Sequence, residues 1–259
     1  MPAVDFIKAL MTKDFNPDEP RDESGKWTTG GASGAPKPAG PTGGKLADRM
    51  FAANKNIPPK MGINETAAKA TLEERQAVSG YKDGKYREMN KYLALKSLGK
   101  DVSHLPGWVQ DRVKAMDEAI ERLGTVLKEG LLYRGISSPE VKAKDWKAAI
   151  GTNIDWPGFT SASKDYSFSK MSKSWAGSGT LFRIYTHAGT KALDYEMFKN
   201  HPNGSDHLKN EGYTYKDSEH EVILNRSSRF YVKDAKVMPN GSWQVDLILN
   251  RRSKRQQYD

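Results

Sequence analysis

The sequence predicts an α+β fold in which a helical first part packs on a core of antiparallel strands. Between residues 45 and 130, apolar side chains recur at intervals of three and four, which is the period of an amphipathic helix. After Gly130 the sequence pattern changes to short segments rich in β-branched and aromatic residues. Helices gathered in one part of the chain and strands in another indicate helices packed on an antiparallel sheet.

The chain of 259 residues is expected to hold one folded domain, residues 45–259, behind a flexible leader, residues 1–44. Residues 30–44 read GGASGAPKPAGPTGG, a composition that cannot bury enough apolar surface to offset the entropy of ordering it. The preceding DFNPDEPRDESGKWT resembles a short leader that recurs near the ends of phage-encoded structural and effector proteins. An ordinary disordered tail explains it equally well.

The helical part, residues 45–130, shows its period most clearly in two stretches. Tyr86 to Leu93, with Asn90 inside it, forms one, and Val109 to Leu127 forms the other. Thr71 followed three residues later by Glu74 is a capping-box sequence, which predicts that a helix begins there.

Residues 131–250 are predicted to form the β core, and the basic residues 251–259 a solvated tail. The predicted strands are LLYRG (131–135), GFTSAS (158–163), TLFRIYT (180–186), EHEVILN (219–225), SRFYVKDAKV (228–237) and SWQVDLIL (242–249). Asn240-Gly241 predicts a two-residue hairpin turn before the last strand. Residues 165–179 fit either a short helix or a loop.

The composition excludes several kinds of chemistry. Cysteine is absent, which rules out disulfides, thiolate metal sites and cysteine nucleophiles. The five histidines lack metal-binding spacing, so no metal is expected. No apolar run approaches the ~18 residues of a membrane span, and no secretory signal is visible, so we expect a soluble protein without a membrane partner. The net charge of +9 favours acidic partners or phosphates in general, although nucleic-acid binding is not expected.

Two acidic residues offer the first sign of chemistry. On a strand, alternation puts Glu219 and Glu221 on one face while Val222 and Leu224 point to the other. Two carboxylates held close can divide the work of an electrostatic stabiliser and a proton acceptor. An exposed strand face, however, is the usual explanation of this spacing when it stands alone.

Two further segments add to this interpretation. In LLYRG, Arg134 ends a short apolar strand and can fork onto phosphate oxygens, while Gly135 lets the backbone come close to a ligand. In GFTSAS, hydroxyl groups can hold a neighbouring carboxylate or ligand by hydrogen bonds. A structural ion pair remains the alternative for Arg134.

Arg, then aromatic-x-Ser-x-Ser, then Glu-x-Glu, on successive strands behind a helical region, resembles the Arg-Ser-Glu class of ADP-ribosyltransferases. This class includes clostridial binary-toxin enzymatic components and related bacterial exoenzymes, and the resemblance covers residues 45–249. It also includes Asn90 within a helix. The resemblance implies the ADP-ribosyltransferase fold, with a helical N-terminal part on two mainly antiparallel β-sheets, and NAD as co-substrate without a metal.

The resemblance assigns roles around NAD. Arg134, flanked by Tyr133 and Gly135, would hold the NAD phosphates. Ser161 would position Glu221, which would hydrogen-bond a hydroxyl of the nicotinamide ribose and stabilise the positive charge that develops on the sugar.

Two features of the serine segment qualify these roles. The family's Ser-Thr-Ser is Ser-Ala-Ser here, so Ala162 lacks one hydroxyl while Ser163 keeps its own. Phe168 and Trp175 follow in the segment that covers nicotinamide in relatives, and either is a candidate to stack on the nicotinamide ring. Core packing is the favoured alternative for at least one of them.

Glu219 implies arginine as the acceptor, because a carboxylate can orient a guanidinium and take its proton. Tyr213 and Tyr215, in the loop before it, are candidate contacts to an unidentified target protein, with ordinary loop packing as the alternative. The predicted activity is therefore a mono-ADP-ribosyltransferase specific for arginine, acting as a monomer. Alternatives are an NAD glycohydrolase of the same fold and a catalytically silent phage module. The leader further suggests phage expression or delivery and action in a bacterial cytoplasm.

Overall fold

The computed structural model describes residues 44–52, 70–136, 145–166, 179–195 and 220–250. Most of the predicted leader and part of the 165–179 segment lie outside these ranges. Among the described residues, the helical elements are α2 (Gly44–Ala52), α3 (Leu72–Gly80), a π-helical turn η2 (Tyr81–Lys85), α4 (Tyr86–Ser97) and α5 (Trp108–Leu123). The helical first part of the domain is thus confirmed.

The capping box predicted at Thr71 is present at the start of α3. The Thr71 hydroxyl accepts the Glu74 backbone N–H at 3.2 Å, and the Glu74 carboxylate accepts the Thr71 backbone N–H at 2.7 Å. These bonds satisfy two amide groups that would otherwise lack partners at the first turn. The α3–η2–α4 run therefore has a fixed beginning.

The strands form the second part of the domain. Their bounds are β1 (Thr125–Leu127), β2 (Gly130–Ile136), β3 (Asn153–Trp156), β4 (Thr160–Ser163), β5 (Thr180–Thr186), β6 (Thr190–Asp194), β7 (Glu221–Leu224), β8 (Ser228–Val237) and β9 (Trp243–Leu249). The predictions for β5 and β8 match the observed ends. Three short strands, β1, β3 and β6, were not predicted, because runs of three to five residues carry too little periodicity to register.

Two sequence predictions of local structure are wrong. Leu127 was grouped with the last helix, but α5 ends at Leu123 and Leu127 lies on β1. The chain turns away at Gly124, where a Cβ atom would come within 2.1 Å of the Ile120 carbonyl oxygen. The β8–β9 hairpin has a five-residue connection, 238–242, rather than a two-residue turn, because Val237 is the residue that pairs with Trp243.

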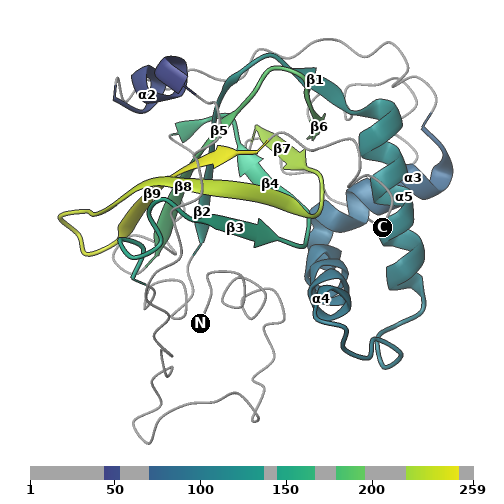
Figure 1. The fold of residues 1–259 in the computed structure, drawn as a ribbon. Helices are drawn as coiled ribbons and strands as arrows, with labels where there is room; N and C mark the ends of the chain where they lie inside the picture. Colours follow the sequence, from purple (N-terminus) through teal and green to yellow (C-terminus); the bar gives the residue numbers. More distant parts are fainter. Residues whose placement is uncertain (1–43, 53–69, 137–144, 167–178, 196–219, 251–259) are drawn as a thin grey trace, which may run out of the picture.

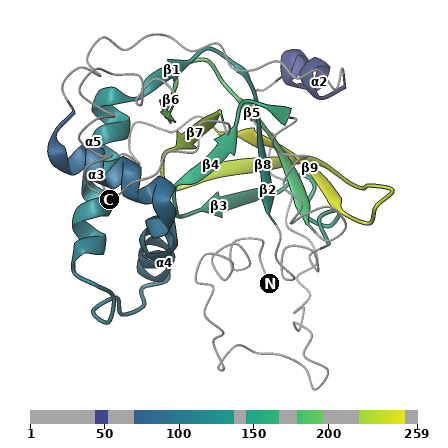
Figure 2. The same cartoon turned by 180° about the vertical axis from the view of Figure 1, so that it is seen from behind.

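The strands follow the order β1-β6-β7-β4-β2-β5-β9-β8-β3, and every neighbouring pair is antiparallel except β5 with β9. The order divides into two halves, β1-β6-β7-β4 and β2-β5-β9-β8-β3, which are joined through β2 and β4 by one registered pair, Tyr133 with Ser163. These halves correspond to the two mainly antiparallel sheets that the resemblance implied. Figure 1 shows α3, α4 and α5 gathered on one side of the strands and α2 on the other, and Figure 2 shows the same separation from behind.

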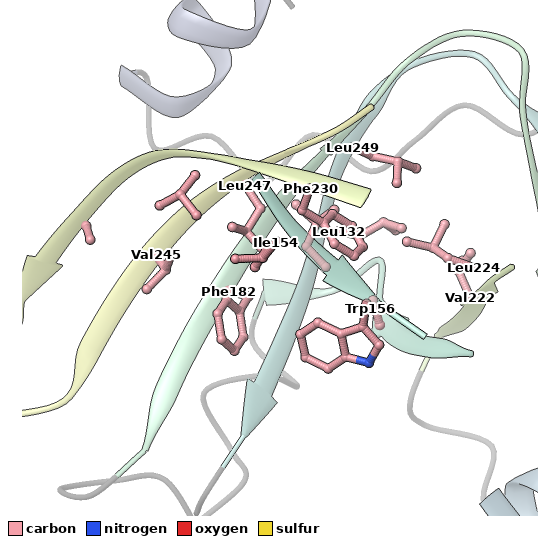
Figure 3. Close-up of a cluster of buried hydrophobic side chains, with 14 of the residues drawn as sticks. Leu132, Ile154, Trp156, Phe182, Val222, Leu224, Phe230, Val245, Leu247 and Leu249 are labelled. Atoms are coloured by element: carbon pink, nitrogen blue, oxygen red, sulfur yellow. The ribbon is translucent and has the colours of Figure 1, made fainter. Parts of the chain in front are cut away.

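Three buried clusters lie between these layers. The central cluster contains residues from both halves of the strand order, including Leu132, Trp156, Phe182 and Val222 (Figure 3). A second cluster joins α3, α4 and α5 to side chains such as Ile223 on the outer face of β7, and a third joins α2 to the outer face of β2, β5 and β9. Because both faces of the strands are covered, β5 and β7 are buried along their whole length.

Candidate active site

The candidate site is built where β4 and β7 pair. Ser163 lies opposite Glu221 in the antiparallel register, and Ser161 lies opposite Ile223. Alternation therefore places Ser161, Ser163 and Glu221 on the face toward the helices, while Ala162 turns to the central cluster. Placed on paired strands, the hydroxyls and the carboxylate face the same layer of the molecule.

Glu221 is held by Ser161. The Ser161 hydroxyl donates a hydrogen bond to Glu221 Oε1, and the residue Glu221 is only 7% exposed. The Arg134 guanidinium, from β2, donates to the Ser161 backbone carbonyl. The structure thus brings Arg134, Ser161 and Glu221 together, three residues that the sequence placed on three separate segments.

Arg134 is partly sequestered from solvent. Its guanidinium carbon lies 5.2 Å from the centre of the Trp156 ring. Burial lowers the pKa of the guanidinium, while the Tyr81 phenol and the Glu221 carboxylate oppose that shift. It remains a cation, because an arginine pKa starts so far above neutrality. Its buried Nε has no hydrogen-bond partner among the described residues. The side chain therefore keeps a donor available for an anionic ligand.

The acceptor of the site is Glu221 Oε2, a buried carboxylate oxygen. Its partner in the described part of the chain is the Lys82 ammonium. A carboxylate oxygen has more than one lone-pair direction, so Oε2 can also accept a hydrogen bond from a ligand hydroxyl. Arg134 and Glu221 together offer a cationic donor and an anionic acceptor.

The helical layer reaches the same site through η2. Lys82 Nζ lies 2.7 Å from Glu221 Oε2, and both side chains are below 10% exposed. The neighbouring Tyr81 is buried, and its hydroxyl donates to the Phe159 carbonyl at 3.0 Å. Burial raises the pKa of Tyr81, so this phenol stays protonated at neutral pH.

Asn90 ties α4 to the chain just before β4. Its side-chain oxygen accepts the Phe159 backbone N–H at 3.0 Å, and its amide donates to the Phe159 carbonyl at 3.3 Å. The amide also donates to the Tyr81 hydroxyl at 3.3 Å. Asn90 thereby acts like a neighbouring strand and fixes the helices against the segment that carries Ser161.

The remaining predicted site residues fall in different places. Ser163 is buried, and its hydroxyl accepts the Asp165 backbone N–H at 2.9 Å. Gly135 is exposed on β2, whereas Tyr133 packs in the cluster beneath α2, on the opposite face of β2 from Arg134. The structure therefore does not bring Tyr133 to Arg134 and Glu221.

Several predicted residues cannot be placed. Glu219, Phe168, Trp175, Tyr213 and Tyr215 lie outside the described residues. The strand that was expected to carry Glu219 begins only at Glu221, because His220 has a left-handed backbone with φ of 44°. Alternation along an extended strand therefore applies from Glu221 onward.

Sequence reasoning missed three residues of the site. Trp156 could have been found, since it alternates with Ile154 on the unpredicted β3. Tyr81 lies in the part of the chain that was predicted to be helical, and the helical period gave it no role at the site. Lys82 left no signal at all, because a lysine in a helix is normally a solvated residue.

Comparison with known families decides the classification. The family model for the ADP-ribosyltransferase exoenzyme matches residues 53–252. The chain belongs to this family. The Arg-Ser-Glu resemblance read from the sequence is thereby confirmed, and the site just described lies within the matched region.

Solved structures agree on the fold. The Clostridium limosum C3 exoenzyme is similar with a TM-score of 0.54 and 18% identity, over 79% of this chain and 95% of that one. Plx2a, an ADP-ribosyltransferase toxin from Paenibacillus larvae, gives 0.53 and 14%, over 80% and 94%. C3stau2 from S. aureus, solved with NAD, gives 0.50 and 14%, over 80% and 95%. No curated protein matches the chain.

The family and the fold support ADP-ribosylation, with NAD as the donor of the ADP-ribose. Within the described ranges, no helix is long and apolar enough to cross a membrane. The same residues contain no group of three His, Asp or Glu side chains placed to hold a metal ion.

Proposed function

We propose that the protein is a mono-ADP-ribosyltransferase that cleaves NAD and transfers ADP-ribose to an arginine of another protein. The observation that supports this most directly is the junction of Arg134, Ser161 and Glu221, where a cationic donor and a buried carboxylate meet. NAD offers groups that suit both, because its phosphates accept from a guanidinium and its ribose hydroxyls donate to a carboxylate.

In the proposed reaction, Glu221 accepts a hydrogen bond from a hydroxyl of the nicotinamide ribose. The bond between ribose C1′ and the nicotinamide nitrogen then breaks, and its electron pair leaves with nicotinamide. The positive charge that develops on the sugar lies near the Glu221 carboxylate, which the Ser161 hydroxyl holds in place. Because nicotinamide leaves as a neutral molecule, the step needs no metal ion.

Glu219 is proposed as the residue that selects arginine. A guanidinium nitrogen attacks C1′ and loses a proton, and a nearby carboxylate can both orient the guanidinium and accept that proton. Tyr213 and Tyr215 are proposed contacts to the target protein. The role of Glu219 rests on the sequence motif, and the roles of the two tyrosines rest on their place in the loop before it. We further propose, from the leader sequence, that the enzyme acts in a bacterial cytoplasm after phage expression or delivery.

The test is an assay of nicotinamide release and of ADP-ribosyl-guanidine formation from NAD and a small guanidine such as agmatine. We expect Glu221→Gln to abolish both products, with kcat falling by at least ~100-fold, because the carboxylate charge acts in the transition state. Glu219→Gln should lose the guanidine product and retain NAD hydrolysis. Asp155→Asn, which removes a charge from an exposed ion pair on β3, serves as the control with unchanged rates.

The alternatives predict different results. Nicotinamide release by the wild-type protein without any guanidine product, even with bacterial lysate as a source of acceptors, would identify an NAD glycohydrolase. No NAD turnover under either condition would leave a binding module.

A further inference from the structure

The ion pair between Lys82 and Glu221 has no part in the reaction as proposed so far. Lys82 Nζ lies 2.7 Å from Glu221 Oε2, so the two side chains form an ion pair. We propose that Lys82 is a positioning residue that holds Glu221 in its reactive, ionised orientation. This inference rests on the proposed function of Glu221.

Lys82 is buried where it meets Glu221. The Lys82 side chain is 9% exposed, and its Nζ lies 5.5 Å from the ring centre of Tyr195, which is itself buried in the cluster under the helices. The ammonium and the carboxylate therefore meet where both are buried.

The two oxygens of Glu221 are thus held differently. Oε1 accepts from the Ser161 hydroxyl, and Oε2 faces the ammonium without accepting a hydrogen bond from the described residues. A carboxylate oxygen has more than one lone-pair direction, so Oε2 can accept from a ribose hydroxyl while the ammonium stays in place. Ser161 and Lys82 together fix the plane of the carboxylate.

The charge of Lys82 has a second consequence. A buried carboxylate is costly to ionise unless cations lie near it. Among the described residues, Lys82 from η2 forms an ion pair with Glu221, and Arg134 from β2 also interacts with it electrostatically while its guanidinium donates to the Ser161 carbonyl. Lys82, in ion-pair contact with Glu221, therefore supplies compensating charge directly beside the carboxylate.

The backbone explains how Lys82 reaches the site. Consecutive residues on an α-helix lie about 100° apart and do not normally face one partner. Within the π-helical turn η2, Tyr81 and Lys82 both point to the strand layer, one to Phe159 and the other to Glu221. Such π-helical turns are frequent at functional sites, which agrees with a local irregularity that serves the site.

The experiment compares kcat and KM for NAD in wild type, Lys82→Met, Lys82→Gln and Lys82→Arg. We expect kcat of the two neutral variants to fall by about tenfold or more with KM changed by less than about threefold, since the carboxylate acts in the transition state. Lys82→Arg should recover most of the rate because it restores the cation. Lys191→Met, which breaks an exposed ion pair with Glu121, is the matched control with unchanged kcat.

A melting curve for each variant separates a rate effect from loss of folding, and the neutral, polar Lys82→Gln serves if Lys82→Met does not fold. Wild-type kcat in the neutral variants, or a lower KM with kcat undiminished, would overturn the role of Lys82 alone. Absence of NAD turnover by the wild-type protein would instead overturn the proposed function, and with it this inference.

Discussion

At the scale of single residues, the site depends on the Asn90 side chain, which takes the place of a neighbouring strand as hydrogen-bond partner for a backbone segment. Asn90 pairs with both the N–H and the carbonyl of Phe159, two groups that are buried and not paired in the sheet ladder. Because the backbone at Phe159 leads directly into β4, this side chain positions Ser161 without touching it. Asn90 therefore contributes both to the stability of the protein and to the geometry of the site.

Asn90→Ala should lower the free energy of unfolding by about 1–3 kcal/mol, because it leaves the Phe159 N–H buried without its partner. Urea denaturation checks this value. Tyr81→Phe is the comparison. It removes the hydroxyl that donates to the Phe159 carbonyl, but this carbonyl keeps its hydrogen bond from the Asn90 amide, so the loss should be about 1 kcal/mol. An equal loss in both variants would contradict the special role of Asn90.

At the scale of elements, the run from α3 through η2 to α4 is more than a scaffold. It begins with the Thr71 capping box, presents Tyr81 and Lys82 from η2, and continues into Asn90 on α4. Gly84, within η2, has φ of +102°, a conformation that L side chains rarely adopt. The π-helical turn therefore depends on a glycine at this position.

Gly84→Ala should lower the free energy of unfolding by about 1–2 kcal/mol through the backbone alone. Nothing lies within 4 Å of the added Cβ, so a clash cannot contribute. Gly107→Ala is the matched control, since it also meets no atom within 4 Å but has φ of −57°. Urea denaturation of both variants measures the difference, and an equal effect would show that the left-handed conformation is not the cause.

At the scale of the whole molecule, α2 and the helices of the site cover opposite outer faces of the strands. α2 is attached through Arg183 on β5, which donates to the Phe51 carbonyl at 3.1 Å and lies 5.3 Å from the Phe51 ring centre. The same guanidinium is paired with Asp246 on β9, with Arg183 Nε 2.6 Å from Asp246 Oδ1. A second ion pair, Lys233 with Asp48, is exposed.

Asp246→Ala should destabilise the protein by about 3–5 kcal/mol, because it leaves the buried Arg183 guanidinium without its carboxylate. The double variant Arg183→Met, Asp246→Leu should regain a large part of this loss, since it removes both charges. Lys233→Ala, which breaks the exposed pair to the same helix, should cost less than about 1 kcal/mol. Chemical denaturation gives all three values, and similar losses for the buried and exposed pairs would refute the argument.

Much of the site could be predicted because its motif residues are local signals. Arg134 at the end of a strand, Ser161 in a hydroxyl-rich strand and Glu221 before an apolar run were identified from the sequence, and the structure brings all three together. Lys82 could not be identified, because its role depends on a π-helical turn and on a strand about 140 residues later in the chain. Tyr133 was assigned to the site because it precedes Arg134 in the motif, but its side chain packs beneath α2.

By itself, the sequence determined the α+β class, the start of α3 at its capping box, the bounds of β5 and β8 and the family of the chain, because each rests on a local pattern of a few residues. The tertiary structure alone decided the short strands β1, β3 and β6, the length of the β8–β9 turn and the approach of Lys82 to Glu221. Strand register and buried charge pairs are set by contacts between distant segments. Their free energy arises only when those segments pack, so no local pattern records them.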